Sequence, residues 1–314
     1  MYYAGIDIGG MSIKVGIVNE NGEILINRAI ATDSSSGFSV MVSNMATLIK
    51  ELLLELSIKE NDLSGIGIGI PGVADSKKGI VTTAVNIGWR NVNMVEEFHK
   101  YFKMPVRISN DANCAALGEQ RFGAAKGKSD VIMVTLGTGV GAGIIIDGKL
   151  IEGNGSAGAE AGHMIINMHG LPCACNGHGC WEQYASATAL IRQTKLAMAK
   201  NPTSLMHDVF KEKGTVSGRT AFIAAERGDR AGQEVVDEYI SYVSVGLIGL
   251  GNVLHPEVFV IGGGISHEKE RLTAPIKRYL DNYIAISGFY PEIDVVPASL
   301  GNDAGIIGAA ALVM

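Results

Sequence analysis

The N-terminal segment alternates short apolar runs with turn signals. The runs YYAGIDI, SIKVGIV and EILINRAIA are separated by a Gly-Gly pair and an Asn-Gly pair. Glycine-containing turns between apolar runs are typical of β-hairpins. The pattern therefore predicts three strands joined by hairpins over residues 2–31.

A helix is predicted next, because apolar residues over 38–56 recur at a spacing of three to four. Short strands and helices then alternate as far as Gly123, which suits a helix C-terminus. The expected elements are a buried strand over 65–70, a turn at Pro71-Gly72, a helix near 94–102, a strand over 106–109 and a helix from Asp111.

Residues 131–153 repeat the opening pattern of strand, glycine-rich turn, strand, tight turn and strand. Self-similarity at this distance favours two related halves, whereas chance recurrence of glycine-turned hairpins is the alternative. The rest is expected to be mostly helical over 184–253, followed by a strand, a glycine turn and a helix start over 258–265.

Length and charge exclude several classes of protein. A single core rarely grows beyond about 250–300 residues, so the 314 residues suggest two domains. No apolar run reaches the ~18 residues that span a bilayer, and MYYAGIDIGG lacks the pattern of a secretion signal, so we expect a cytoplasmic protein without a membrane partner. A net charge of -6 without clustered Lys and Arg argues against nucleic-acid binding.

Three of the four cysteines and three of the seven histidines fall within GHMIINMHGLPCACNGHGCWE. Disulfides are rare in a reducing compartment, so the cluster favours a metal site. Structural zinc prefers a closed tetrahedron, and the candidate ligands are His163, Cys173, Cys175 and Cys180. His169 and His178 are alternative fourth ligands, and three buried free thiols are the alternative without a metal.

Three glycine-rich turns are candidate phosphate-binding segments: DIGGMSIK from Asp7, LGTGVGAG from Leu136 and IGGGIS from Ile261. Backbone N–H groups in such turns converge on phosphate oxygens. Neither of the first two ends in the Gly-Lys-Ser/Thr of a Walker loop, and only the third leads into a predicted helix, whose N-terminus favours anions. Tight hairpin turns are the alternative explanation for each segment taken alone.

Acidic residues at two places are candidates for chemistry. Asp111 follows a strand and opens a helix, where unsatisfied backbone N–H groups favour the ionised carboxylate, although an ordinary helix cap has the same pattern. Glu160 and Glu182 bracket the cysteine segment. They are either solvated surface charges or side chains that a bound metal would hold rigid.

In combination and order, these motifs resemble the ROK family of bacterial sugar kinases and repressors, within the hexokinase and actin superfamily. The resemblance covers nearly the whole chain and is carried by DIGG, Pro71-Gly72, NDAN, LGTGVGAG, EAGH, CACNGHGCWE, GGG and GNDAG. Within the family it is greatest to glucokinases of Gram-positive type, through NIGW at Asn86, NDANCAALGE and LGTGVGAGIIIDGKL.

The resemblance implies an α/β protein with the two-domain actin/hexokinase-like (ribonuclease H-like) fold, which has duplicated mixed sheets and an interdomain cleft. The smaller N-terminal α/β domain would be 1–116, completed by a C-terminal helix over 303–314. The larger C-terminal α/β domain would be 117–302, with the zinc loop at 163–180. A homo-oligomer, either a dimer or a tetramer, is implied as well.

The implied activity is transfer of the ATP γ-phosphoryl group to the 6-hydroxyl of a hexose, and the glucokinase-like segments favour glucose. Asp111 would be the base that accepts the hydroxyl proton. The implied sugar ligands are Gly72, Asn110, Asp111, Glu160, His163 and Glu182, with Asn86 as a further contact. Asp7 would organise Mg2+ through water, and the other residues implied in ATP binding are Gly9, Gly10, Ser12, Lys14, Thr138, Gly139, Gly262, Gly263 and Gly264.

In the family pattern, His163 also binds zinc, through one ring nitrogen, and a sugar hydroxyl through the other. The structural zinc would thereby orient a substrate ligand.

Met11 departs from the family pattern, in which a threonine hydroxyl faces the phosphates. Losing that hydrogen bond would cost on the order of 1.5–3 kcal/mol unless Ser12 or backbone donors replace it. One alternative is therefore a catalytically impaired sugar-binding protein, and another is a kinase for N-acetylmannosamine, fructose, mannose, allose or a β-glucoside. A sugar-responsive repressor would need an added helix-turn-helix before the first hairpin, which here begins at Tyr2, so we do not expect one.

Overall fold

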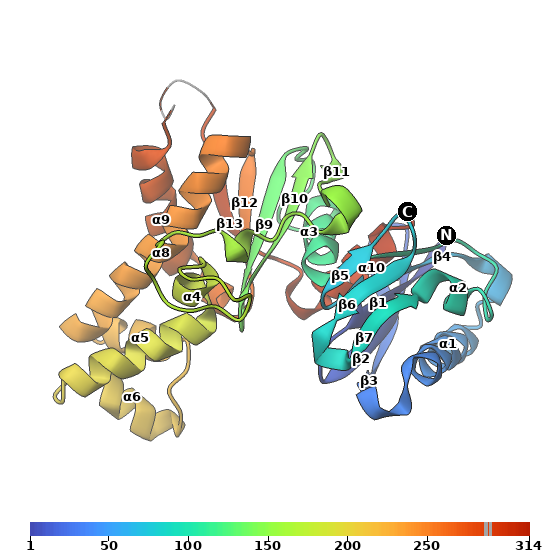
Figure 1. The fold of residues 1–314 in the computed structure, drawn as a ribbon, viewed down its shortest axis with the longest axis horizontal. Coiled ribbons are helices and arrows are strands. Elements are labelled where there is room, and N and C mark those ends of the chain that lie inside the picture. Colours follow the sequence, from blue (N-terminus) through green and yellow to red (C-terminus); the bar gives the residue numbers. More distant parts are fainter. Residues whose placement is uncertain (286–287, 289–290) are drawn as a thin grey trace. The chain divides into compact units, whose positions relative to one another are not determined.

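The computed structural model describes residues 1–285, 288 and 291–314. The chain divides into two compact units (Figure 1). The first contains Met1–Val131, Gly143–Ala159 and Ser299–Met314, and the second contains Ile132–Ala142 and Glu160–Ala298. Residues 117–131, 143–159 and 299–302, which we expected in the second domain, thus belong to the first compact unit.

The first unit is built on a five-stranded mixed sheet with the order β3-β2-β1-β4-β8. The predicted hairpins are confirmed, since β1 pairs antiparallel with β2, and β2 with β3. β4 and β8 then extend the sheet by parallel pairing. The strands are β1 (Tyr2–Ile8), β2 (Ser12–Asn19), β3 (Ile24–Ala31), β4 (Leu63–Ile70) and β8 (Val106–Asn110).

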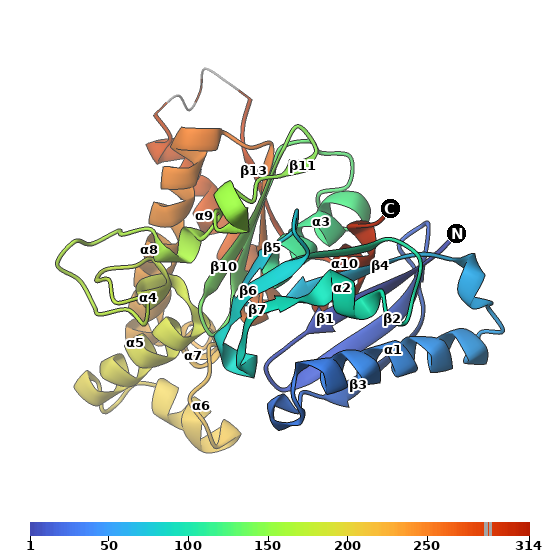
Figure 2. The same cartoon turned by 45° about the vertical axis from the view of Figure 1, so that its right-hand side comes forward.

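Helix α1 (Phe38–Glu55) packs against β2 and β3 (Figure 2). Its buried positions Met41, Met45 and Leu52 lie on one face, at the helical spacing that the sequence pattern predicted. They join the core beneath the sheet together with α2 (Met94–Phe98), which is shorter than the predicted helix.

Helices α3 (Asp111–Phe122) and α10 (Ala304–Ala311) pack against each other, and α10 also packs against β1 and β4. A Cβ atom on Gly67 would lie 1.7 Å from the carbonyl oxygen of Ala309, so only glycine permits this approach. The expected C-terminal helix over 303–314 thus forms within the first unit, where α10 covers the sheet.

A small antiparallel sheet between β4 and α2 was missed in the sequence. It has the order β5-β6-β7 and contains β5 (Val73–Asp75), β6 (Ile80–Ala84) and β7 (Trp89–Asn93). These strands have three to five residues and mix exposed with buried positions, so no regular alternation of polarity marks them.

The second five-stranded sheet has the order β11-β10-β9-β12-β13. Its strands are β9 (Val131–Leu136), β10 (Val140–Ile146), β11 (Lys149–Leu150), β12 (Val258–Gly262) and β13 (Asp294–Pro297). Both sheets run third, second, first, fourth and fifth strand, so the internal repeat expected from the sequence is confirmed. The chain passes from one unit to the other within β9, after Val131, and again within β10, after Ala142.

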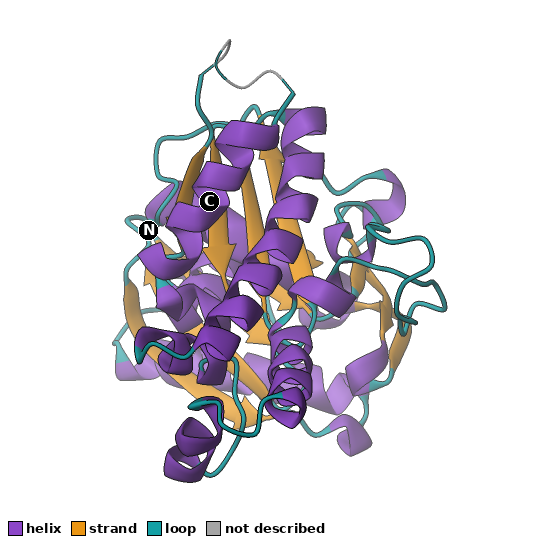
Figure 3. Cartoon of the chain, turned by 90° about the vertical axis from the view of Figure 1, so that its left-hand side faces the viewer, coloured by secondary structure: helices purple, strands orange, loops and turns teal. Residues whose placement is uncertain are grey.

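The second unit is rich in helices, as predicted for residues 184–253. They are α4 (Glu182–Ala185), α5 (Ala187–Lys200), α6 (Met206–Lys213), α7 (Thr220–Glu226), α8 (Arg230–Leu254) and α9 (Glu270–Tyr283). Figure 3 shows helices lying in front of the strands. The helix start expected by residue 265 is met by a 3-10 helix over Gly264–Glu268, whereas the α-helix α9 begins only at Glu270. Among the described residues, no helix is long and apolar enough to cross a membrane.

Glu119 of α3 is fully buried, and its carboxylate accepts four hydrogen bonds. Oε2 accepts from the Ala124 N–H at 2.7 Å and the Ser299 hydroxyl at 3.0 Å. Oε1 accepts from the N–H groups of Ser299 at 2.9 Å and Leu300 at 2.8 Å. Glu119 therefore fixes the chain where it enters the first unit on the way to α10.

Replacement Glu119→Ala should strongly destabilise the protein, because it leaves three backbone N–H groups without their acceptor. Hydrogen bonds to charged groups contribute about 1.5–3 kcal/mol each, so we expect a loss of at least about 3 kcal/mol in denaturant unfolding. The matched control is Glu234→Ala on the exposed surface of α8, where loss of the ion pair with Arg230 should cost less than about 1 kcal/mol. Equal losses in the two variants would contradict this role of Glu119.

Candidate active site and metal centre

The junction of β8 and α3 holds the candidate base. Asn110 caps the helix, with its side-chain oxygen 2.8 Å from the N–H of Ala112. Asp111 is the first helical residue, and its Oδ1 accepts from the same N–H at 2.8 Å. Both carboxylate and amide are therefore oriented by the helix N-terminus, as expected from the sequence.

The structure brings Gly72 to this junction. The side-chain amide of Asn110 donates a hydrogen bond of 3.1 Å to the carbonyl oxygen of Gly72. Gly72 has a φ of 142°, and a Cβ there would lie 2.3 Å from the Thr83 oxygen, so the turn requires glycine. Two of the expected sugar ligands are thus in direct contact.

Cys114, the cysteine outside the metal cluster, lies fully buried in α3 behind the candidate base. Burial raises the pKa of its thiol well above the usual range, and the negative charges of Asp111, Asp7 and Glu152 add to the shift. The thiol therefore stays protonated, and three carboxylates from separate segments act on one point in the first unit.

Asp7 and Lys14 face each other across the β1–β2 hairpin. The Lys14 Nζ lies 3.6 Å from Oδ2 of Asp7 and donates to the carbonyl oxygen of Asn302 at 3.2 Å. Burial raises the pKa of Asp7, and the positive charge of Lys14 opposes this shift. A Cβ on Gly305 would lie 2.5 Å from the carboxyl carbon of Asp7, so the GNDAG motif leaves room for this carboxylate at the start of α10.

The turn of the same hairpin is held by hydrogen bonds from its own backbone and from Thr32. Gly9 N–H donates to the Ser12 oxygen at 2.9 Å, and the Thr32 hydroxyl donates to the Gly9 oxygen at 2.7 Å. The Thr32 N–H also bonds the Met11 oxygen, and the Met11 side chain is 89% exposed. Sequence analysis missed Thr32, because nothing in its own segment marks it as a partner of the glycine turn.

Two glycine turns of the second unit meet at the ends of β9 and β12. Gly263 has a φ of 80°, and a Cβ on it would lie 2.4 Å from the Leu136 oxygen. The turn 136–139 closes through a 3.0 Å hydrogen bond from the Gly137 N–H to the Gly139 oxygen. The structure therefore brings the expected ATP-binding segments around Gly139 and Gly263 together.

Glu182 at the start of α4 links this turn to the cysteine segment. A Cβ on Gly139 would lie 2.6 Å from Oε2 of Glu182. Oε1 of the same carboxylate lies 3.0 Å from Sγ of Cys173 and 3.9 Å from Nδ1 of His163. Glu160 is close to His163 along the chain, and its carbonyl oxygen accepts from the N–H of His163 while its side chain is exposed.

The four expected metal ligands converge. One ligand atom from each of His163, Cys173, Cys175 and Cys180 lies within 4.8 Å of all the others. The Cys175 and Cys180 sulfurs are 3.5 Å apart, and the Cys173 sulfur is 3.7 Å from the His163 Nδ1. A zinc–sulfur bond of about 2.3 Å in a tetrahedron places sulfurs ~3.8 Å apart, so the donor set and its spacing fit zinc. Among the described residues, neither His169 nor His178 belongs to this group.

Without a cation, two of the three thiols disfavour ionisation. Burial and the neighbouring thiols raise the pKa of Cys180 to about 12, and burial raises the pKa of Cys173. The pKa of Cys175 is lowered, mainly by the backbone N–H of Gly177. A metal ion would stabilise three thiolates at this site and release their protons.

Comparison with known proteins decides the family. The model of the ROK family matches residues 3–314. The chain belongs to the ROK family. It is 37% identical over 314 residues to a glucokinase of Halalkalibacterium halodurans, covering 99% of this chain and 94% of the relative, and 35% identical to a glucokinase of Streptomyces coelicolor, covering 98% and 96%.

A solved relative supports the fold. The crystal structure of a ROK family glucokinase from Streptomyces griseus, in complex with glucose and AMPPNP, has a TM-score of 0.80 and 34% identity, and 99% of each chain is covered. The actin/hexokinase-like fold expected for this ROK protein is confirmed.

The cysteine cluster predicts specific metal binding. Replacement Cys175→Ser should weaken zinc binding at least ~10-fold, because one thiolate of the closed set is lost. The control His178→Ala changes a histidine of the same segment that lies outside the cluster and should keep about one zinc per chain. Elemental analysis after dialysis against a chelator measures both. Zinc lost from His178→Ala but retained by His163→Ala would make His178 the fourth ligand.

The raised pKa of Asp7 predicts a dependence of stability on pH. Because the folded-state pKa lies above the ordinary value of 3.8, the ionised carboxylate is less favourable in the folded than in the unfolded protein. Asp7→Asn should therefore raise Tm of the ligand-free protein near neutral pH. The gain should shrink as pH falls through the raised pKa and vanish below 3.8. A lower Tm than wild type at neutral pH, with the exposed control Asp62→Asn unchanged, would refute this.

Proposed function

We propose that this ROK protein is an ATP-dependent glucokinase, which transfers the γ-phosphoryl group of ATP to the 6-hydroxyl of glucose. The observation that carries the proposal is the full-length similarity to glucokinases, at 37% identity over 99% of the chain. The structural relative solved with glucose and AMPPNP supports both substrates. A cytoplasmic location and a homo-oligomeric state remain predictions from the sequence.

Asp111 is the proposed general base. Its position at the N-terminus of α3 keeps the carboxylate oriented, and its Oδ1 is held by the N–H of Ala112. The second oxygen would accept the proton of the sugar 6-hydroxyl as the oxygen attacks the γ-phosphorus. Asn110 and Gly72, already bonded to each other, are the proposed ligands of neighbouring hydroxyls, with Asn86 as a further contact.

The proposed phosphate-binding part of the site consists of charged side chains and backbone N–H donors. Phosphoryl transfer depends mainly on positioning and on charge stabilisation. Magnesium, when bound, neutralises phosphate charge, and Asp7 is the residue proposed to hold it through water. Lys14 is a cation beside Asp7. The remaining proposed ATP contacts are Gly9, Gly10, Ser12, Thr138, Gly139, Gly262, Gly263 and Gly264.

The zinc cluster has a structural role in this proposal. Four protein ligands fill a tetrahedral site, which leaves no position for a reacting water. Zinc at Nδ1 of His163 would leave the other ring nitrogen for a sugar hydroxyl. Glu160 and Glu182 are the other ligands proposed on this side of the sugar, and Glu182 lies beside both the cluster and Gly139.

An impaired kinase is the second candidate, favoured by the 89% exposed Met11 in the first hairpin. A hydroxyl group lies close to the same turn, because the Thr32 side chain donates a hydrogen bond to the Gly9 oxygen.

Selectivity among sugars would come from buried hydrogen-bonding groups of the protein. A wrong epimer leaves such a group without its partner, at a cost of about 1–3 kcal/mol each.

The test is an ADP-release assay with Mg-ATP across glucose, mannose, fructose, allose, N-acetylmannosamine and a β-glucoside. The highest kcat/KM with glucose supports the proposal. A higher value for another sugar reassigns the substrate, whereas sugar binding without ADP release from any of them establishes the impaired alternative.

In the same assay, Asp111→Ala should reduce kcat by about 10²–10⁴-fold, because general base catalysis contributes this much. Glucose binding, measured by calorimetry, should persist. The control is Asp62→Ala, which removes an exposed carboxylate of the first unit that is distant in sequence from Asp111. This variant should retain full activity. Near wild-type turnover in Asp111→Ala would refute the assignment of the base.

A further inference from the structure

Glu152, in the loop after β11, joins two segments of the first unit. Its Oε1 accepts a 2.6 Å hydrogen bond from the hydroxyl of Ser109, and its Oε2 accepts one of 2.6 Å from the hydroxyl of Ser76. Both bonds are short, as expected for hydroxyl donors to a carboxylate. No motif in the sequence marked Glu152, because its partners lie 43 and 76 residues away.

Ser109 places one end of this link next to the candidate base. It is fully buried in β8 and directly precedes Asn110 and Asp111. Its oxygen also accepts a 3.3 Å hydrogen bond from the side-chain amide of Asn113 in α3. The hydroxyl of Ser109 is thus held from both sides, by the loop and by the helix that begins at Asp111.

Ser76 places the other end near Gly72. It directly follows β5, which starts at Val73. The hydroxyl of Ser156 accepts from the Ser76 N–H at 3.2 Å and lies 3.2 Å from its hydroxyl, so the loop holds this turn at two points. Two connections therefore join the β5 segment to the end of β8. One is the direct hydrogen bond from Asn110 to the Gly72 oxygen, and the other runs from Ser76 through Glu152 to Ser109.

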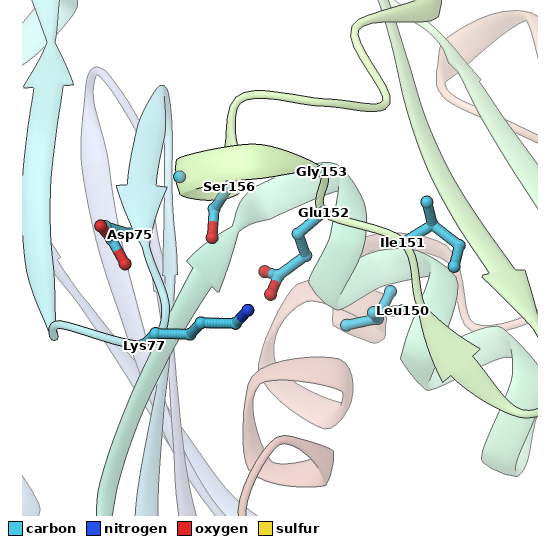
Figure 4. Close-up of a pocket in the computed structure, with 8 residues that line it drawn as sticks. Asp75, Lys77, Leu150, Ile151, Glu152, Gly153 and Ser156 are labelled. Atoms are coloured by element: carbon cyan, nitrogen blue, oxygen red, sulfur yellow. The ribbon is translucent and has the colours of Figure 1, made fainter.

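The carboxylate of Glu152 borders a cavity of about 240 Å³, which is lined by polar side chains of Asp75, Lys77 and Ser156 and by apolar ones of Leu150 and Ile151. Figure 4 shows the side chains of Lys77 and Ser156 extending toward Glu152. Asp75 forms an ion pair with Lys78 at 2.8 Å at the same turn. Glu152 is thus half-buried beside these charged side chains, and its two short hydroxyl bonds fix the orientation of its carboxylate.

We propose that Glu152 is a positioning residue for the sugar, because it fixes Gly72 and the Asn110–Asp111 junction relative to each other through Ser76 and Ser109. This inference rests on the proposed sugar kinase function and adds a residue to it. Among the hydrogen bonds described for Glu152, none reaches the hairpin of Asp7 and Lys14. Its effect therefore falls on the sugar and spares ATP.

The hydrogen bonds of the two serines distinguish this positioning role from a purely electrostatic role of the Glu152 charge. A serine hydroxyl both donates and accepts, so it can turn to accept from an amide. The substitution Glu152→Gln would therefore keep a bond to each serine, whereas Glu152→Ala would keep neither. Displacement of a reacting group by about 1 Å costs up to ~100-fold in rate.

Glu152→Ala should therefore lower kcat/KM for the sugar by about 10–100-fold, with KM for ATP within about twofold of wild type. Glu152→Gln should recover most of the loss. The double variant Ser76→Ala/Ser109→Ala removes both bonds, together with the contacts of these hydroxyls to Ser156 and Asn113. It should lower kcat/KM for the sugar at least as much as Glu152→Ala, which keeps the test valid if the alanine variant folds poorly. Asn154→Ala, in the same loop, is the control and should behave as wild type.

Hydrogen exchange of the ligand-free proteins provides a readout independent of catalysis. Glu152→Ala should increase exchange in residues 72–76 and 109–112, and Glu152→Gln should not. Equal changes in KM for sugar and ATP, no rescue by glutamine, or unchanged exchange would overturn the proposal. Absence of sugar phosphorylation by wild type, with the exchange pattern as expected, would overturn the proposed function while leaving the link itself established.

Discussion

The first unit depends on the close contact between its last helix and its first strands. Cβ atoms on Gly5 and Gly67 would lie 2.0 and 1.7 Å from carbonyl oxygens of α10, and one on Gly308 would lie 1.7 Å from the Cys114 oxygen. Backbone therefore packs on backbone, between α10 and the sheet on one side and between α10 and α3 on the other. This packing places the start of α10, beside Asp7, and the N-terminus of α3 in the same unit, so the residues proposed for the phosphates and for the base are held by one packed core.

Carboxylates in this unit are held by different means according to their tasks. Glu119 is buried and accepts four hydrogen bonds, which suits a fixed anchor. Asp7 is half-buried with Lys14 as its cationic neighbour, and its raised pKa means that the ligand-free site stabilises the anion less than water does. Such a site gains from a bound cation, which is consistent with the proposed role beside the phosphates.

In the second unit, one carboxylate joins the metal cluster to a phosphate turn. Glu182 lies against Cys173 with one oxygen and leaves no space for a side chain at Gly139 with the other. The candidate metal cluster and the turn 136–139 therefore both contact this one side chain. A metal ion held by this cluster would therefore lie beside both Glu182, a proposed sugar ligand, and the proposed ATP-binding turn.

The hairpins, the repeated sheet pattern, the metal ligands and the helix at Asp111 were predictable from the sequence by itself. Each is a local pattern, because alternation, turn glycines and ligand spacing depend on residues close along the chain. Only the tertiary structure decided which distant residues hold these pieces, as with Glu119 and Ser299, 180 residues apart, or Glu152 and Ser76. It also decided the short β5-β6-β7 sheet. In the described part of the chain, the predicted ligand His163, and not the alternative His178, lies in the metal cluster. Such contacts follow from the packing of whole elements, which leaves no periodicity or spacing in the sequence.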